Sequence, residues 1–254
     1  MIDLGHLNDL SPWLIVLAPI VITIAYTVFG LSGFGSTVIS VPILAHFLPV
    51  SYLVPLMALL DLASASIIGT QGREHVSRAE MKRIIPFMFI GFIVGGTVLV
   101  GVPDHYLRVA LGTFAMSVGA YSIVNPVVAK KFSTWWCIPV GVVGGAVATV
   151  FGAGGPIYAT YLSGRLEDKT EIRSTMSALI SISAFTRALV YVVSGLMLHL
   201  AILAGLVVLA PFVWAGLRLG HHIHVNLTQQ QMRRAIGGLL LVTGGSLLVR
   251  ALLH

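Results

Sequence analysis

The sequence predicts an all-α polytopic membrane protein made of two inverted-topology repeats. Three observations indicate this fold class: the composition, a series of long apolar segments, and a glycine-rich break that occurs once in each half. Of the 254 residues, 57% are hydrophobic and only 9% are charged. Soluble domains carry roughly 25% charged residues, so this chain cannot cover a globule with a charged surface.

The apolar segments are the expected helices. They are 12–30, 36–48, 51–70, 84–101, 106–125, 134–151, 156–163, 174–194, 198–217 and 234–251. A helix that crosses the hydrocarbon core needs about 20 residues, and most segments are long enough. Segments 36–48 and 156–163 are shorter and each follows a glycine-rich break. We expect these two to be half-helices, the return limbs of broken hairpins.

The two breaks have related sequences. They are Phe29-Gly30-Leu31-Ser32-Gly33-Phe34-Gly35-Ser36 and Phe151-Gly152-Ala153-Gly154-Gly155-Pro156. Glycine costs about 1 kcal/mol relative to alanine inside a helix, so such runs interrupt helices. Inside a membrane, broken backbone is tolerated only where it faces protein or a watery cavity. Matched breaks in both halves of a hydrophobic chain therefore predict the binding site of a transporter.

The halves also match beyond the breaks. At one constant spacing, Pro86-Phe87, Gly91, Gly95, Arg108, Ala110, Gly112 and Gly119 correspond to Pro211-Phe212, Gly216, Gly220, Arg233, Ala235, Gly237 and Gly244. We expect a first transmembrane repeat at 1–125, a cytoplasmic linker at 126–133 and a second, inverted repeat at 134–254. Each repeat is a broken hairpin followed by three longer helices. The alternative is chance similarity, because glycine and apolar matches are frequent in such a sequence.

The basic residues indicate the orientation of the repeats. Most of the fifteen Lys and Arg residues lie in the connections 71–83, 126–133, 164–173 and 218–234. Short cytoplasmic loops collect Lys and Arg. If each hairpin returns to its own side and each half adds three crossings, all four basic connections lie in the cytoplasm and both termini lie outside. The net charge of +6 then reflects membrane orientation, and no nucleic-acid partner is expected.

The helix starts behind the breaks are suited to an anion. The first turn of a helix presents unpaired amide groups and about half a positive charge. Ser36 is expected as a cap or first-turn residue and Pro156 at the first helical position. The candidate substrate-binding residues at the breaks are Ser32, Gly33, Phe34, Gly35, Ser36, Gly154, Gly155, Pro156 and Tyr158. The alternative is that the glycines serve only close helix packing.

Two charged residues lie inside apolar segments, Asp61 in 51–70 and Arg187 in 174–194. Intramembrane charges cost roughly 2.5–3.5 kcal/mol on insertion scales and face a cavity or a partner. Arg187 binds an anionic substrate, neutralises Asp61 or pairs with another group. Asp61 either has a static pairing role or carries a coupling proton.

Metal and cofactor chemistry has little support. His221, His222 and His224 lie on an expected cytoplasmic loop without an acidic or cysteine companion, so no metal site is expected there. No cofactor is expected, and the chain lacks a glycine-rich loop ending in Gly-Lys-Ser or Gly-Lys-Thr. A permease that moves a cation or a metal by way of Asp61 is an alternative to an anion carrier.

An intramembrane hydrolase is the remaining alternative. Ser32 and Ser36 lie in glycine-rich surroundings, as a nucleophile could. No histidine lies at a matching depth in a later segment, since His199 is near an expected membrane face. The general base is therefore missing, and the chain is not expected to be an enzyme.

The two breaks resemble those of the TauE/SafE family of bacterial membrane permeases. The basic loop around Arg73-Glu74-His75-Val76 and the stretch from Arg173 to Gly195 are also similar to that family, so the resemblance covers almost the whole chain. The resemblance implies a carrier in the bacterial inner membrane that exports sulfite, organosulfonates such as sulfoacetate, or related small anions. Pro156 and Ile157 stand where the first break has Phe34 and Gly35, so the two half-sites are not expected to be equivalent.

Two glycine pairs sit at matched positions of the repeats. They are Gly91-x-x-x-Gly95 and Gly216-x-x-x-Gly220. Small residues at this spacing allow helices to approach closely in a membrane. We expect these faces to pack within one subunit or between the subunits of a homodimer. The expected partners are therefore the small anionic substrate, the lipid bilayer and a second copy of the chain.

Overall fold

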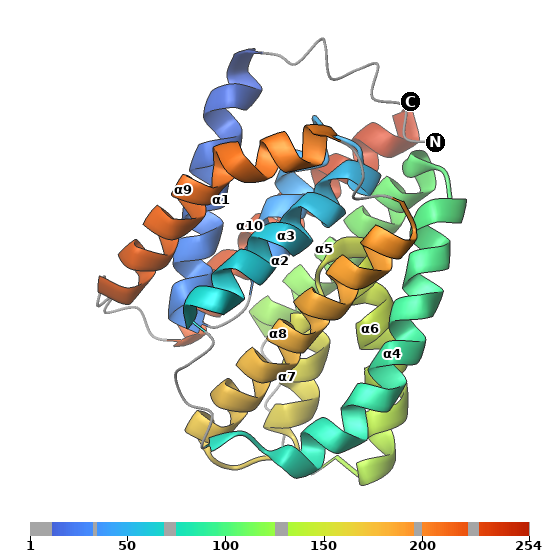
Figure 1. Cartoon of the computed structure of the whole chain (residues 1–254), viewed down its shortest axis with the longest axis vertical. Coiled ribbons are helices and arrows are strands. Elements are labelled where there is room, and N and C mark those ends of the chain that lie inside the picture. The colour runs from blue at the N-terminus through green and yellow to red at the C-terminus, as the bar shows by residue number, and fades with distance from the viewer. Residues whose placement is uncertain are drawn as a thin grey trace.

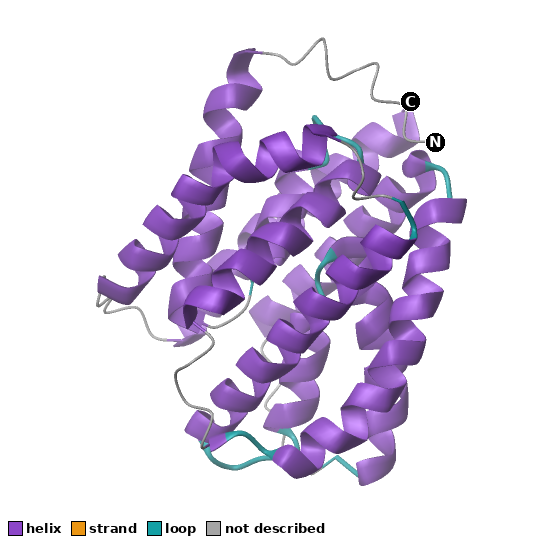
Figure 2. Cartoon of the chain, viewed as in Figure 1, coloured by secondary structure: helices purple, strands orange, loops and turns teal. Residues whose placement is uncertain are grey.

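The computed structural model describes residues 12–32, 35–68, 75–124, 132–195, 200–222 and 229–253, which form helices joined by short connections (Figures 1 and 2). The α-helices of these ranges are α1 (Pro12–Ser32), α2 (Ser36–Leu44), α3 (Val50–Ile68), α4 (Arg78–Gly101), α5 (Asp104–Val124), α6 (Cys137–Phe151), α7 (Gly155–Ser163), α8 (Lys169–Val193), α9 (Leu200–His222) and α10 (Gln229–Leu253). A 3-10 turn, Thr134–Trp136, precedes α6. The described residues contain no strand.

Most of these helices can cross a membrane. Within the described ranges, 7 helices are long and apolar enough to do so, and α3 carries a shorter apolar stretch, Val50–Ser64. Large apolar side chains such as Ile93, Val207 and Val242 point outward and are more than half exposed. A bilayer would cover such a surface. The predicted class, an all-α polytopic membrane protein, is confirmed.

Two helices are too short to cross. α2 and α7 have nine residues each, which gives a length of about 14 Å at 1.5 Å per residue. They begin at the two breaks, as the glycines predict. Figure 2 shows residues 152–154, in the second break, as a teal segment near the middle of the molecule.

The start of α2 agrees with the expectation, and the start of α7 differs from it by one residue. Gly35 is the N-cap of α2 and has a φ of 107°, a left-handed conformation that suits glycine, so Ser36 is the first helical residue. α7 begins with Gly155, so Pro156 occupies the second helical position rather than the first. Proline is tolerated there because the amide groups of the first turn have no partner within the helix.

Long helices from opposite halves pack against each other. α4 lies along α6 and α9 lies along α1. A Cβ atom on Gly91 would lie 2.2 Å from the Val142 carbonyl oxygen, and one on Gly216 would lie 2.6 Å from the Thr23 carbonyl oxygen. Both predicted glycine faces therefore pack within one subunit, and each brings the fourth helix of one half onto the first helix of the other.

The last helices of the two halves, α5 and α10, also pack against each other. A Cβ atom on Gly112 would lie 3.0 Å from the Gly244 carbonyl oxygen, and one on Gly119 would lie 2.8 Å from that of Gly237. The residue number rises along one helix as it falls along the other, so the pair is antiparallel. Gly112 matches Gly237 in the repeat and Gly119 matches Gly244. Exchanging the halves therefore leaves this contact unchanged.

A buried ionic cluster binds the C-terminal end of α7 to α4. The Glu80 carboxylate of α4 is 3% exposed and accepts hydrogen bonds from Tyr161 Oη at 2.8 Å and from Arg165 Nη2 at 2.9 Å. Arg83 Nη1 lies 2.7 Å from the same carboxylate. Arg165 also donates to the Phe132 carbonyl oxygen. The cluster fixes α7 to α4 near the connection 164–168, which lies toward the bottom of Figure 1.

Candidate anion-binding site

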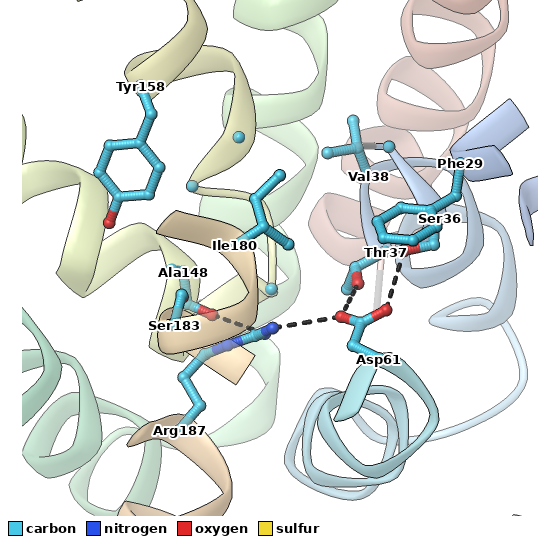
Figure 3. Close-up of a pocket in the computed structure, with 14 residues that line it drawn as sticks. Phe29, Ser36, Thr37, Val38, Asp61, Ala148, Tyr158, Ile180, Ser183 and Arg187 are labelled. Atoms are coloured by element: carbon cyan, nitrogen blue, oxygen red, sulfur yellow. Dashed lines mark hydrogen bonds and ion pairs between the residues drawn. The ribbon is translucent and has the colours of Figure 1, made fainter. Parts of the chain in front are cut away.

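A cavity lies where the two half-helices begin (Figure 3). Its walls come from both breaks, from α3 and from α8. The lining residues are Phe29, Gly35, Ser36, Thr37, Val38, Asp61, Ala148, Gly152, Gly154, Gly155, Tyr158, Ile180, Ser183 and Arg187. About 20 Å³ is open to the centre of a water-sized sphere, which is room for about one water molecule. The site is closed around a small volume.

The Asp61 carboxylate stands in the wall of this cavity and is saturated with donors. Oδ1 accepts from Tyr26 Oη at 2.8 Å and from Ser36 Oγ at 2.9 Å. Oδ2 accepts from Thr37 Oγ1 at 2.9 Å and from Arg187 Nη2 at 3.1 Å. An ionised carboxylate has about four lone-pair sites, so these four donors fill them. Asp61 is 3% exposed, and no water is needed to satisfy it.

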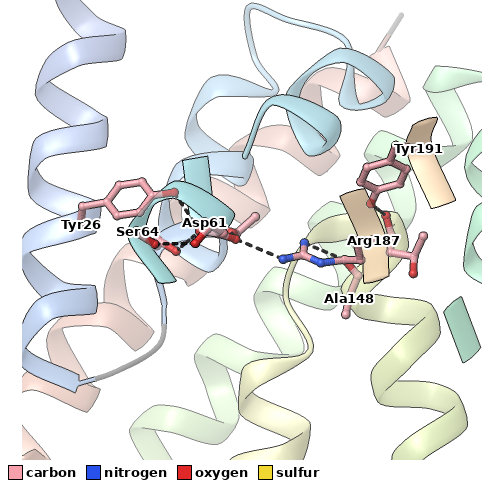
Figure 4. A network of polar contacts seen from close by, with 9 residues as sticks. Tyr26, Asp61, Ser64, Ala148, Arg187 and Tyr191 are labelled. Atoms are coloured by element: carbon pink, nitrogen blue, oxygen red, sulfur yellow. Dashed lines mark hydrogen bonds and ion pairs between the residues drawn. The ribbon is translucent and has the colours of Figure 1, made fainter. Parts of the chain in front are cut away.

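Arg187 faces Asp61 across the cavity and is 2% exposed (Figure 4). Its Nη1 donates to the Ala148 carbonyl oxygen in the last turn of α6 at 3.1 Å, while its Nη2 is paired with Asp61. Tyr191, one turn further along α8, donates to the Thr149 carbonyl oxygen. Helix α8 is thus bonded to the end of α6 at two successive carbonyl groups. The guanidinium is held at the second break.

Two buried donors of the cavity walls have no hydrogen-bond partner among the described residues. They are the Tyr158 hydroxyl and Arg187 Nε. Tyr158 is 1% exposed and comes from the first turns of α7. A buried donor without a partner costs about 1–3 kcal/mol. An ordered water or a ligand in the cavity would satisfy such donors.

Few amide donors are free at the start of α7. At α2 the Ile39 amide donates to the Gly35 carbonyl oxygen, at 3.1 Å. In α7 the Ile157 amide already bonds to the Gly154 carbonyl oxygen, at 3.1 Å, and Pro156 has no amide hydrogen. Pro156 and Ile157 therefore offer no free amide to an anion at the start of α7.

Gly152 brings the second break onto the first. It has a φ of 70° and is the left-handed cap at the end of α6. A Cβ atom there would lie 2.0 Å from Thr37 Cγ2 and 3.2 Å from Arg187 Nη1. Glycine suits this position because its backbone is left-handed and an added Cβ would clash with the Thr37 methyl group beside Asp61.

The structure brings together many of the candidate site residues. Those that line the one cavity are Gly35, Ser36, Asp61, Gly154, Gly155, Tyr158 and Arg187. Pro156 is next to the lining residue Gly155 but is not itself part of the wall. Gly33, Phe34 and the side chain of Ser32 lie outside the described residues. Arg187 forms the pair with Asp61 that was one of its expected roles.

Sequence reasoning missed two tyrosines of the site. Tyr26 donates to Asp61 from α1, and Tyr191 bonds to the end of α6. Both are fully buried. The available signal for Tyr26 is a phenol near the end of an otherwise apolar helix, about one turn before the break. A polar group that deep in a membrane helix needs a partner.

Comparisons with known proteins give the family. The family described as "Sulfite exporter TauE/SafE" matches residues 18–247, which include both breaks and the whole cavity. The chain is 24% identical over 193 residues to a protein of Comamonas testosteroni described as "Probable inner membrane transporter protein TsaS", a match that covers 76% of this chain and 81% of that one. No solved structure matches. The match confirms the resemblance that the breaks carry: the chain belongs to the sulfite exporter TauE/SafE family of membrane transporters.

Proposed function

We propose that this protein exports a small sulfur-containing anion, such as sulfite, sulfoacetate or a similar organosulfonate, through a site between the starts of α2 and α7. Membership of the sulfite exporter family supports the transport activity and the class of substrate. The location of the site is supported by one cavity. There the starts of two half-helices meet the buried Arg187 guanidinium and two donors without a partner among the described residues.

The groups around the cavity suit a sulfur oxyanion. Sulfite and sulfonates present three acceptor oxygens on one sulfur atom. The cavity offers the first-turn amides of α2, the hydroxyls of Ser36 and Thr37, the phenol of Tyr158 and the charged Arg187. Charge-assisted bonds from a guanidinium are roughly twice as strong as neutral ones. In the structure, Ser36, Thr37 and Arg187 Nη2 donate to Asp61, so an anion that enters would take over donors from that carboxylate.

We also propose that the two halves are inverted repeats and that both termini lie outside the cytoplasm. The antiparallel contact of α5 with α10 supports this, because equivalent helices pack antiparallel about a twofold axis that lies in the membrane plane. The pairing of α4 with α6 and of α9 with α1 has the same exchange symmetry. Connections 102–103 and 194–195, which carry no Lys or Arg, lie in the upper half of Figure 1, and connection 164–168 lies at its bottom.

Gradients supply the energy for export in this proposal, because the sequence has no nucleotide-binding loop. If the anion crosses alone, a potential that is negative inside favours its exit by about 2.3 kcal/mol per charge per 100 mV. If a proton crosses with it, the potential has no effect and the concentration gradient of the substrate drives the exit. A carrier that moves a small anion outward can therefore work without ATP.

A cation carrier based on Asp61 is not favoured by this geometry. Both carboxylate oxygens already accept bonds from hydroxyl and guanidinium donors, so their lone pairs are not free for a metal ion. Arg187 also places a positive charge beside the carboxylate. Among the described residues, no cluster of three or more His, Cys, Asp or Glu could hold a metal ion.

The test is a flux assay with purified protein in liposomes. Wild-type protein should release labelled sulfite or methanesulfonate much faster than protein-free liposomes, and Arg187→Ala should abolish this flux while Arg187→Lys keeps part of it. The matched control is Arg108→Lys, since Arg108 pairs with Asp104 away from the cavity and should transport normally. Absence of flux in the wild type, or an unchanged affinity in Arg187→Ala, would refute the proposal.

A further inference from the structure

We propose that the anion and one proton bind together: the anion takes the place of Asp61 on Arg187, and Asp61 takes up the proton. Each singly charged anion would then move with one proton, and transport would be electrically neutral. This inference rests on the proposed function, because it names the second ligand of the same site.

The closed site already holds an anion of its own. The ionised Asp61 carboxylate accepts two hydroxyl bonds from the first turn of α2 and one bond from Arg187. These are the donors that an oxyanion substrate would use. Because an ionised carboxylate only accepts hydrogen bonds, Asp61 competes with the substrate for them as long as it stays charged. Substrate binding therefore requires that Asp61 stop accepting at least one of these hydrogen bonds.

The charge of the buried site indicates how this happens. Asp61 and Arg187 have opposite charges and are both at most 3% exposed, so the closed site is neutral. Adding a singly charged anion alone would leave one uncompensated negative charge in the interior, which is strongly unfavourable at low dielectric. Adding the anion together with a proton on Asp61 restores neutrality, with Arg187 as the counter-ion of the substrate.

The hydrogen bonds around Asp61 can accommodate this exchange. A proton on Oδ2 turns that oxygen from an acceptor into a donor. The Thr37 hydroxyl can turn and accept, because a hydroxyl group both donates and accepts. Arg187 cannot accept, so its Nη2 is released toward the cavity. Oδ1 keeps its bonds from Tyr26 and Ser36. No covalent bond changes, and the proton comes from and returns to water.

No other group near Asp61 is suited to take the proton. Among the described residues, the titratable or charged groups that face it are Tyr26 of α1, Arg187 and Tyr191 of α8, and Tyr158 of α7. The phenols are neutral and the guanidinium stays protonated at ordinary pH. Helices α2 and α6 contribute only hydroxyls, backbone groups and apolar side chains to the wall. The carboxylate of Asp61 is the acceptor that remains.

Methanesulfonate is the probe for the test, because it stays a monoanion across the working pH range, whereas sulfite itself titrates. If one proton enters with each anion, the dissociation constant of the wild-type protein rises about tenfold per pH unit wherever free Asp61 is ionised. In liposomes, an imposed pH gradient should drive methanesulfonate flux. A potassium diffusion potential set with valinomycin should not change its initial rate.

Asp61→Asn is the diagnostic variant, since it is neutral at every pH. It should bind methanesulfonate with a dissociation constant that is flat with pH, and it should lose flux driven by the pH gradient. Asp104→Asn is the matched control: Asp104 accepts from the Val50 amide and pairs with Arg108 outside the cavity, so this variant should keep the tenfold slope.

The outcomes separate the two proposals. Wild-type flux that responds to the membrane potential and not to the pH gradient would overturn the proton exchange and leave anion transport standing. The same holds if Asp61→Asn keeps the pH slope of the wild type. If the wild-type protein neither binds nor moves methanesulfonate and sulfite, the proposed function fails and the proton exchange fails with it.

Discussion

Gly152→Ala tests whether the two breaks support each other. The new methyl group would meet two obstacles in the structure. The backbone at residue 152 is left-handed, with a φ of 70°, and this conformation costs an alanine about 1–2 kcal/mol. Its Cβ would lie 2.0 Å from Thr37 Cγ2, so α2 must shift, at a further cost of about 1–3 kcal/mol for overpacking. The variant should therefore lose about 2–5 kcal/mol of unfolding free energy.

The chain offers a matched control in Gly195. Its φ is 73°, almost the same, but no atom of the described residues lies within 4 Å of an added Cβ. Gly195→Ala should therefore show the conformational cost alone, about 1–2 kcal/mol. Chemical unfolding in detergent, followed by circular dichroism, measures both variants. The difference between them isolates the contact with Thr37.

Thr37→Ser provides the rescue. It removes Cγ2 and keeps the hydroxyl that donates to Asp61. In the double variant with Gly152→Ala, the nearest atom of residue 37 would be its Cβ at 2.9 Å, so the rescue should be partial. We expect a coupling energy of about 1–2 kcal/mol in the double-mutant cycle. If the two glycine variants are equally destabilised, or if the coupling is zero, the contact between the breaks does not carry the energy assigned to it.

The remaining predictions concern the other contacts of the fold. Arg187→Ala should lower the unfolding free energy by about 3–5 kcal/mol because Asp61 stays buried without its counter-ion. Adding Asp61→Asn to this variant should recover a large part of the lost unfolding free energy. A double variant no more stable than Arg187→Ala alone would contradict this. Tyr161→Phe removes one bond to the buried carboxylate of α4 and should cost about 1 kcal/mol with normal flux in liposomes. Gly91→Ala should cost about 1–3 kcal/mol through its clash with α6, whereas Gly101→Ala, with nothing within 4 Å, should be within about 0.5 kcal/mol of the wild type in the same unfolding assay.

The half-helices were predictable because their signal is local. Glycine interrupts a helix through its own backbone freedom, and the left-handed Gly35 and Gly152 stand at the two breaks. The predicted segments 36–48 and 156–163 correspond to α2 and α7, with ends that differ by up to four residues. α2 ends at Leu44 rather than at 48, because residues 45–47 form turns with bonds such as that from the Phe47 amide to the Leu44 carbonyl oxygen.

The partner of Arg187 was not predictable in the same way. The sequence places Asp61 and Arg187 in corresponding segments of the two repeats, but whether they touch depends on how α3 and α8 are rotated about their axes. No local pattern specifies that rotation, so pairing and substrate binding both stayed open. The hydrogen bond from Tyr26 to Asp61 was not predictable for the same reason, since it joins two residues that are 35 positions apart in the sequence. The linker predicted at 126–133 lies largely outside the described residues.

The interlocked packing of the halves bears on how the chain is made. Helix α4 finds its main neighbour in α6, and α1 finds its own in α9, so neither half can complete its packing alone. During synthesis, the glycine faces of the first half must contact lipid until the second half has been inserted. A gene cut between α5 and α6 should therefore yield two fragments that are degraded singly and that recover a working protein only when both are produced in one cell.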